Sequence, residues 1–223
     1  MYNPTSLDFD NSGNVYICDS LNRRIRKITI STGIISTFAG GCFNSIGATV
    51  ACSSTTKSGV TTGGIVLSWL GDGLVATAAA FNTPRAIVFN SERTILFITD
   101  SFNHRVRQIV MLTSIISTLA GVTVMTSTTA VANYGSYTGD GGAASFAALN
   151  TLSGLGIDAD DNVIISDTYN QVIRKIDMAS GIISKISGQG VSSTTNVGEN
   201  DTPILKLTAE VSMRYPQHLH VDR

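Results

Sequence analysis

The stretch DSLNRRIRKITISTGIISTFAG, Asp19–Gly40, decides the fold because the chain contains three related copies of it. The second copy is DSFNHRVRQIVMLTSIISTLAG, Asp100–Gly121, and the third is DTYNQVIRKIDMASGIISKISG, Asp167–Gly188. The copies align without a gap, at offsets of 81 and then 67 residues. Self-similarity at a long period is the signature of a repeat architecture. We therefore treat the 223 residues as one array of repeats.

A shorter phrase with the alternation of a β-strand precedes each copy. The phrases are PTSLDFD, PRAIVFN and LSGLGID, and a fourth, PQHLHVD, follows the third copy. In each phrase two apolar residues stand two positions apart, as they do on one face of a strand. The four phrases span Pro4–Asp10, Pro84–Asn90, Leu152–Asp158 and Pro216–Asp222. The sequence therefore predicts that a fourth repeat begins at Pro216 and is cut off.

Each repeat is predicted to form four short strands that pair as an antiparallel meander, because the connections within a repeat are short. The segments are β-branched and aromatic and are bounded by turn formers. After the first phrase, the remaining strands are predicted at Val15–Cys18, Ile25–Ile30 and Ile34–Ala39, at Ile95–Thr99, Val106–Met111 and Ile115–Ala120, and at Val163–Ser166, Ile173–Met178 and Ile182–Ser187.

Both faces of the predicted sheets are apolar. In the third strand of the first repeat, Ile25 points to one face while Ile28 and Ile30 point to the other, whereas a sheet with one solvated face alternates more cleanly. Four-stranded units that must bury both faces stack around an axis as a β-propeller. We predict an all-β propeller of four-stranded antiparallel blades, with three full blades and the first strand of a fourth in a partial ring.

The whole chain, 1–223, is predicted to be a single propeller segment. Its repeats are placed at about 4–40, 84–121, 152–188 and 216–223, and long loops join them at 41–83, 122–151 and 189–215. Two of these loops hold a related phrase, GDGLVATAAAFNTP and GDGGAASFAALNTL. Asp72 and Asp140 are predicted to cap a glycine turn there, and the alanine-rich tail suits one turn of helix. The alternative is a calcium site, although one carboxylate per loop is few for that ion.

The D-[ST]-x-N element that opens each long copy is predicted to be a hairpin device. Asp19 accepts hydrogen bonds from turn N–H groups, and Asn22 tolerates the left-handed region. Arg26 shares a strand face with Ile28 and Ile30, so its half-buried guanidinium needs a carboxylate from its own or the adjacent blade. The competing interpretation makes the ring of aspartates a metal or substrate site. We assign a structural role to Asp19, Asn22, Arg26, Asp100, Asn103, Arg107, Asp167, Asn170 and Arg174.

The composition points to no electrostatic partner. Charged residues make up 14% of the chain, and 15 Lys and Arg stand against 16 Asp and Glu. Nucleic-acid binders usually carry a basic stripe, so no nucleic acid is predicted as a partner. No run of residues reaches the roughly 18 apolar positions of a membrane helix. The opening MYNPTSLDFD has neither the basic start nor the apolar core of a signal peptide, so a leader of a secreted protein is not in this sequence.

Three cysteines are too few for a disulfide-built scaffold. Cys42 and Cys52 lie in one Ser/Thr/Gly-rich insert with nine residues between them. They are predicted either to form a local disulfide in an oxidising compartment or to remain two free thiols, because sequence spacing does not fix Cβ geometry. Cys18 lies in the apolar run VYICD and is predicted to be a small buried hydrophobe.

The repeated pattern resembles the NHL-repeat family. The resemblance rests on D-[ST]-x-N-x-x-[IV]-R, then an IIS-[TK] strand, a glycine, a GDG phrase and a P-x-x-[LI] strand, and it covers nearly all of the chain apart from the inserts. Members of that family form propeller blades, commonly six to a ring, and serve mainly as scaffolds for protein, RNA or carbohydrate contacts. The resemblance therefore implies that this chain is a fragment of a longer one or completes its ring with a second chain.

Enzymatic motifs are weak. No catalytic residue, cofactor or metal site is assigned, since there is no Gly-x-Ser-x-Gly elbow, P-loop or dinucleotide phrase. His218 and His220 form a His-x-His pair that could chelate a metal, but no third ligand can be named, and His104 lies in a turn. All three are predicted to be surface or packing residues. Trp69 is predicted to be either a contact anchor or part of a small loop core, and Asn200 begins the one glycosylation sequon.

The leading hypothesis is a non-enzymatic propeller of an extracellular or cell-surface protein. It would contact protein or carbohydrate through its loops and faces, or form a structural part of a larger assembly. The alternative is a metal-dependent propeller hydrolase or lyase, similar to lactonases or amidating lyases. That alternative needs carboxylates in a central channel, for which Asp8, Asp10 and Asp158 are the acidic candidates on the complete first strands.

Overall fold

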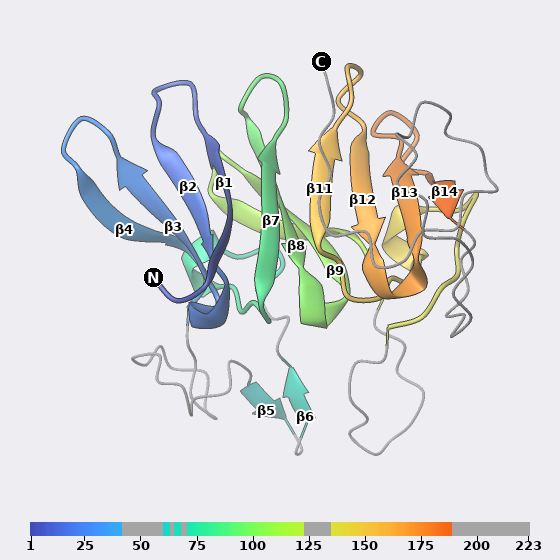
Figure 1. The fold of residues 1–223 in the computed structure, drawn as a ribbon. Helices are drawn as coiled ribbons and strands as arrows, with labels where there is room; N and C mark the ends of the chain where they lie inside the picture. The colour runs from blue at the N-terminus through green and yellow to red at the C-terminus, as the bar shows by residue number, and fades with distance from the viewer. Residues whose placement is uncertain (42–59, 63–64, 68–70, 123–134, 189–223) are drawn as a thin grey trace.

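The computed structural model describes residues 1–41, 60–62, 65–67, 71–122 and 135–188, and within them it forms three four-stranded antiparallel sheets (Figure 1). The first blade comprises β1 (Pro4–Phe9), β2 (Val15–Asp19), β3 (Arg24–Thr29) and β4 (Ile34–Ala39). The second comprises β7 (Pro84–Phe89), β8 (Ile95–Asp100), β9 (Arg105–Val110) and β10 (Ile115–Ala120). The third comprises β11 (Gly154–Ile157), β12 (Val163–Asp167), β13 (Val172–Ile176) and β14 (Ile183–Gly188).

The three sheets stand side by side with their first strands together, as in part of a propeller ring (Figure 1). In each sheet the strands follow chain order, and β7 contacts both β1 and β11. The predicted all-β fold of antiparallel propeller blades in a partial ring is confirmed for these three blades. The phrase Pro216–Asp222, which predicted the first strand of a fourth blade, lies outside the described residues.

Apolar side chains from two blades meet in each interface between neighbours. Tyr16 and Ile25 of the first blade are fully buried in one cluster with Phe89 and Ile98 of the second. The rings of Tyr16 and Phe89 pack edge to face, with their centroids 5.2 Å apart. A second cluster joins Phe97 and its neighbours on the far face of the second blade to the third blade. The second blade therefore buries both of its faces.

The turn between the second and third strands is a short 3-10 helix in every blade. These helices are η1 (Ser20–Asn22), η3 (Ser101–Asn103) and η5 (Thr168–Asn170). The residue after each helix is left-handed, with φ of 57° at Arg23, 54° at His104 and 58° at Gln171. The prediction that Asn22 takes this conformation was wrong by one residue, because the asparagine ends the helix and turns its amide onto the aspartate. In all three blades the third strand starts one residue earlier than predicted, at Arg24, Arg105 and Val172.

The connectors contain the short helices that the sequence predicted and one hairpin that it did not predict. The alanine-rich tails form the 3-10 helices η2 (Ala76–Ala78) and η4 (Ala144–Phe146), one turn each as expected. In the first connector, which was predicted to be a loop, β5 (Val60–Thr62) pairs with β6 (Ile65–Leu67). The sequence VTTGGIVL has β-branched runs on either side of two glycines, which is a hairpin signal. In the described part of the chain, no helix is long and apolar enough to cross a membrane.

The connector also joins neighbouring blades through its backbone. The N–H of Gly40, at the end of β4, donates to the carbonyl of Ala76 at 3.0 Å. A few residues earlier in the connector, the N–H of Gly73 donates to the carbonyl of Ile116 in β10 at 2.8 Å. The same connector is thus bonded to the last strand of the blade it leaves and to the last strand of the blade it is about to form.

The glycine that closes each blade has both a backbone and a packing requirement. Gly121 has a φ of 104°, and a Cβ there would overlap the carbonyl oxygen of His104. Gly141 also has a positive φ, of 80°, but a Cβ there would meet nothing within 4 Å.

We expect Gly121→Ala to lower the free energy of unfolding by about 3 kcal/mol, from strain plus overlap. The control Gly141→Ala should lose about 1 kcal/mol from strain alone. Urea denaturation of both variants checks this, and equal losses would contradict it.

Candidate functional site

A buried aspartate holds the turn between the second and third strands of each blade. In the second blade, the carboxylate of Asp100 accepts hydrogen bonds from the backbone N–H of Asn82 at 2.7 Å and from the side-chain amide of Asn103 at 2.8 Å. The Nη1 atom of Arg107 lies 3.5 Å from the same carboxylate. The aspartate therefore ties together the approach to the first strand, the turn and the third strand.

The other two blades repeat this geometry. Asp167 accepts from the backbone N–H of Asn150 at 2.7 Å and from Asn170 at 2.9 Å. Asp19 accepts from the backbone N–H of Tyr2 at 2.6 Å and from Asn22 at 2.9 Å. Each repeated aspartate thus joins its own turn to the segment that leads into the first strand of its blade.

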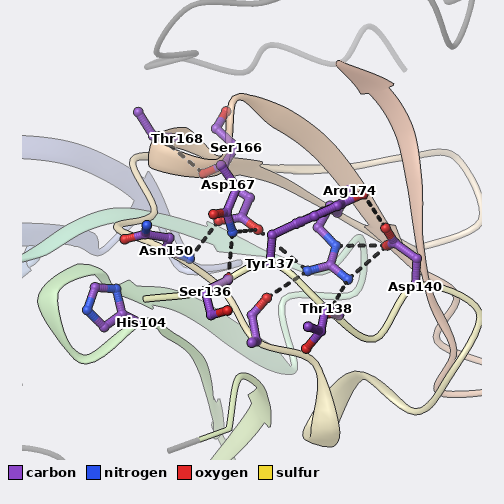
Figure 2. A network of polar contacts seen from close by, with 12 residues as sticks. His104, Ser136, Tyr137, Thr138, Asp140, Asn150, Ser166, Asp167, Thr168 and Arg174 are labelled. Atoms are coloured by element: carbon purple, nitrogen blue, oxygen red, sulfur yellow. Dashed lines mark hydrogen bonds and ion pairs between the residues drawn. The ribbon is translucent and has the colours of Figure 1, made fainter. Parts of the chain in front are cut away.

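In the second and third blades the repeated arginine lies between the turn of its own blade and the connector that precedes that blade. The side chains of Arg107 and Arg174 are both completely buried. Arg174 donates to the backbone carbonyls of Ala148 and Thr138, each at 3.0 Å, and its Nη2 lies 2.8 Å from Asp140 Oδ1 (Figure 2). Its guanidinium also lies 5.2 Å from the centroid of the Tyr137 ring. Burying a guanidinium is costly unless its donors are satisfied, and this shell supplies the acceptors.

The aspartate of the GDG phrase pairs with this buried arginine. Asp72 Oδ1 lies 2.6 Å from Arg107 Nη2, and Asp72 Oδ2 accepts from the hydroxyl of Thr118 at 2.7 Å. In the third blade Asp140 also pairs with the buried arginine: its Oδ1 accepts from Nε of Arg174 at 3.0 Å and lies 2.8 Å from Nη2, while its Oδ2 accepts from the Tyr137 hydroxyl. Sequence reasoning assigned both aspartates to turn capping and missed these ion pairs. The nearly constant interval, 35 residues from Asp72 to Arg107 and 34 from Asp140 to Arg174, was the available signal.

The first blade differs at this point. Arg26 is only partly buried, and the described residues give its guanidinium one hydrogen bond, from Nη1 to Thr37 Oγ1 at 3.0 Å. Within the described residues, no GDG aspartate reaches it.

Burial shifts the titration of the turn aspartates. It raises the pKa of Asp100 and of Asp167 to about 6, although the neighbouring arginine and the N–H donors act in the opposite direction. In the third blade, Tyr137 donates a hydrogen bond to Asp140, and burial together with that bond raises the pKa of the Tyr137 hydroxyl.

The acidic candidates of the first strands are engaged in turns and ion pairs. Asp8 lies 2.6 Å from Arg93 Nη1 and accepts the backbone N–H of Phe89, so it links the first blade to the second. Asp10 and Asp158 each accept hydrogen bonds within their own hairpin turn. Burial acts to raise the pKa of Asp158, but hydrogen bonds from Asn162 and Lys175 lower it to about 2. Among the described residues, no three His, Cys, Asp or Glu side chains gather as a group that could hold a metal ion.

The remaining residues singled out from the sequence divide into two groups. His104 is buried, and its Nδ1 accepts the backbone N–H of Thr151 at 2.9 Å, which joins the second blade to the approach to the third. Cys18 is a buried free thiol, and burial raises its pKa. The others lie outside the described residues: Cys42, Cys52, Trp69, Asn200, His218 and His220.

One position of the repeated turn faces solvent in every blade. It is the x of D-[ST]-x-N, occupied by Leu21, Phe102 and Tyr169, whose exposed fractions are 45%, 38% and 48%. Each backbone N–H donates to a backbone carbonyl in the segment that leads into the first strand, that of Tyr2, Asn82 or Asn150, so the three side chains occupy equivalent places at the same end of their blades. We call these three residues the turn rim. Sequence reasoning missed the turn rim, because it concentrated on the invariant letters of the motif.

The blades and their Asp–Asn–Arg turns define a segment of a β-propeller whose repeats resemble NHL repeats. The family model that matches the sequence is described as the teneurin NHL domain, and it covers residues 72–177. This match confirms the resemblance to NHL repeats inferred from the sequence. No curated protein sequence matches the chain.

Solved structures share the fold at low sequence identity. A Bacteroides thetaiotaomicron protein of unknown function superposes with a TM-score of 0.58 and 16% identity, covering 96% of this chain and 41% of its own. Two auxiliary nutrient binding proteins each have a TM-score of 0.50. The one from B. thetaiotaomicron is 11% identical over 86% of this chain and 37% of its own, and the one from Bacteroides ovatus is 10% identical over 83% and 36%. The chain thus spans about two fifths of the length of each of these three structures.

The buried arginine predicts a large and specific loss of stability. Arg174→Met leaves the carboxylate of Asp167 buried without its cation, so we expect the free energy of unfolding to fall by about 3–5 kcal/mol. The control is Lys175→Met on the same strand, which removes a partly exposed ion pair with Asp158 and should cost at most about 1 kcal/mol. Urea denaturation measures both losses, and similar values for the two variants would contradict the assigned role of the arginine.

The raised pKa of Asp100 predicts a pH dependence. Between its unfolded value of 3.8 and its folded value of about 6, the folded state holds a proton that the unfolded state has released. The free energy of unfolding should therefore fall as the pH rises from about 4 to about 6, and then stop falling. In Asp100→Asn the decline should be smaller, with Asp167 still contributing its part. Urea denaturation of both proteins at several pH values from 4 to 7 checks this, and parallel curves would rule out the contribution of Asp100.

Proposed function

We propose that this chain is part of a non-enzymatic β-propeller that serves as an interaction scaffold in an extracellular or cell-surface protein. The observation that carries the proposal is the turn rim, where three equivalent positions of an otherwise buried motif present Leu21, Phe102 and Tyr169 to solvent. Aromatic side chains are enriched in the cores of protein interfaces, and tyrosine is among the residues that supply much of the binding energy there. The invariant polar residues of the same motif, in contrast, are occupied within the turn.

The partner proposed for the turn rim is a protein, or a carbohydrate that stacks on the aromatic rings. Apolar and aromatic groups at the rim suit such a surface, and the near-neutral net charge of -1 offers no long-range attraction for a charged polymer. The low charge, the Ser/Thr-rich inserts and the match to the teneurin NHL model support the proposed location. The ring itself is proposed to be completed by the rest of a longer chain or by a second chain.

The turn rim can be tested with a triple variant. We expect the unmodified chain to bind at least one member of a panel of purified receptor ectodomains or of a glycan array. Changing Leu21, Phe102 and Tyr169 to serine should weaken that binding at least tenfold, since each side chain contributes contact area. Leu112→Ser is the control, because Leu112 is 95% exposed in the turn between β9 and β10, at the opposite end of the second blade. Equal binding by the triple variant and the control, or no binding by the unmodified chain, would overturn the proposal.

A further inference from the structure

The first blade exposes a face that its two neighbours bury. On β1, Leu7 and Phe9 are 55% and 47% exposed, whereas their counterparts on β7, Ile87 and Phe89, are 5% and 0% exposed. In the second and third blades this face packs against the preceding blade. The first blade therefore presents apolar surface shaped by its repeat to receive a neighbour.

The last strand of the first blade has an edge that is occupied in the other blades. Ile116 in β10 donates its N–H to the carbonyl of Leu74 at 3.0 Å and accepts the N–H of Gly73 at 2.8 Å. Ile183 in β14 makes the same pair with its own GDG phrase. Ile35 holds this register position in β4, opposite Ile28, but no such pair forms within the described residues. The side chain of Ile35 is 41% exposed, and those of its two counterparts are fully buried.

The arginine of the first blade is the third unfilled position. Arg107 and Arg174 each receive the aspartate of the GDG phrase that precedes their blade, at 2.6 and 2.8 Å. Arg26 stands at the same register and is directed to Thr37, the counterpart of the Thr118 hydroxyl that bonds to Asp72. An apolar face, a strand edge and a guanidinium thus coincide on one blade. In the other two blades the preceding blade covers the face, while the GDG phrase bonds to the strand edge and pairs with the guanidinium.

We propose that the outer edge of β4 in the first blade, together with Arg26, is a docking site for an extended Gly-Asp-Gly segment, which adds its backbone to β4 at Ile35 and places its carboxylate on Arg26. Charge complementarity and the two occupied copies in the same molecule identify this occupant. Addition of a strand to a free sheet edge supplies main-chain hydrogen bonds, and the aspartate supplies specificity.

The alignment of the residues ahead of β1 with those ahead of β7 indicates where such a segment would join the chain. Asn3 and Thr83 both stand immediately before a first strand, with φ of 54° and 56°. Tyr2 and Asn82 donate their N–H groups to equivalent aspartates. Met1 therefore occupies the place of Phe81, and residues 71–80, GDGLVATAAA, correspond to the ten positions directly ahead of Met1.

This inference rests on the proposed function in one respect: the completed ring would place a neighbour beside the first blade. It is independent of what binds the turn rim. A second copy of the chain is the main competing occupant, because it would cover the same apolar face without a Gly-Asp-Gly segment.

The test is to supply the segment in register. GDGLVATAAA is fused directly ahead of Met1 in the full chain, and amide hydrogen exchange at Ile35 is followed by NMR. We expect the exchange at Ile35 to slow at least tenfold and the Tm to rise by about 4 °C. A graft reading GNGLVATAAA, or the original graft in an Arg26→Gln chain, should lose at least half of the Tm rise. Arg85→Gln, which removes a positive charge from the second blade, should leave the rise intact.

Three outcomes would overturn the inference. The first is unchanged exchange at Ile35, the second is an equal Tm rise for the two grafts, and the third is a rise that survives Arg26→Gln. Sedimentation of the unmodified chain distinguishes this failure from a failure of ring completion. A dimer in which the Ile35 amide is already protected from exchange would show that a second copy covers the face. That result would contradict the Gly-Asp-Gly site but would agree with completion of the ring by a second chain.

Discussion

The whole arrangement depends on sheets that are apolar on both faces. A single four-stranded blade cannot shield both sides from water, and each Å² of apolar surface left exposed costs roughly 25 cal/mol. The second blade has a neighbour on each side, and both of its faces are buried, with Phe89 on one face and Phe97 on the other. Radial stacking follows from this demand, because each blade serves as solvent shield for the next. The polar network of aspartate, asparagine and arginine is then confined to the interfaces and turns that stacking creates.

Much of the fold could be predicted from the sequence because the repeat supplied three independent readings of the same strand pattern. Where one copy is ambiguous, as in the glycine-rich strand Gly154–Ile157, the other two fix the assignment. The errors concern details that hydrophobic periodicity does not encode. The left-handed residue is Arg23 rather than Asn22. Asn22 ends the 3-10 helix, and its side-chain amide donates to Asp19. The pair β5 and β6 was missed because a Ser/Thr-rich composition masked a short hairpin signal.

The site was harder to predict than the fold for a physical reason. Asp72 and Arg107 are 35 residues apart, and their contact exists only because the connector runs back along β10. Local turn chemistry explains an aspartate between two glycines equally well, so the sequence favoured capping. The turn rim has the opposite character, since variation among leucine, phenylalanine and tyrosine is what a surface position tolerates. Structural residues repeat because the geometry repeats, and residues free to meet a partner are those that the geometry leaves unconstrained.

The connector that bonds to both Gly40 and Ile116 has a consequence for how the array assembles. Each connector is hydrogen-bonded to the end of the last strand of one blade and to the last strand of the next blade. It makes these bonds at positions that precede the first strand of that next blade in the sequence. The blades are therefore coupled as neighbours in a line, as in other repeat proteins. Damage at one joint should loosen two blades at once and leave a distant one intact, so that partial unfolding would proceed by adjacent pairs rather than by single units.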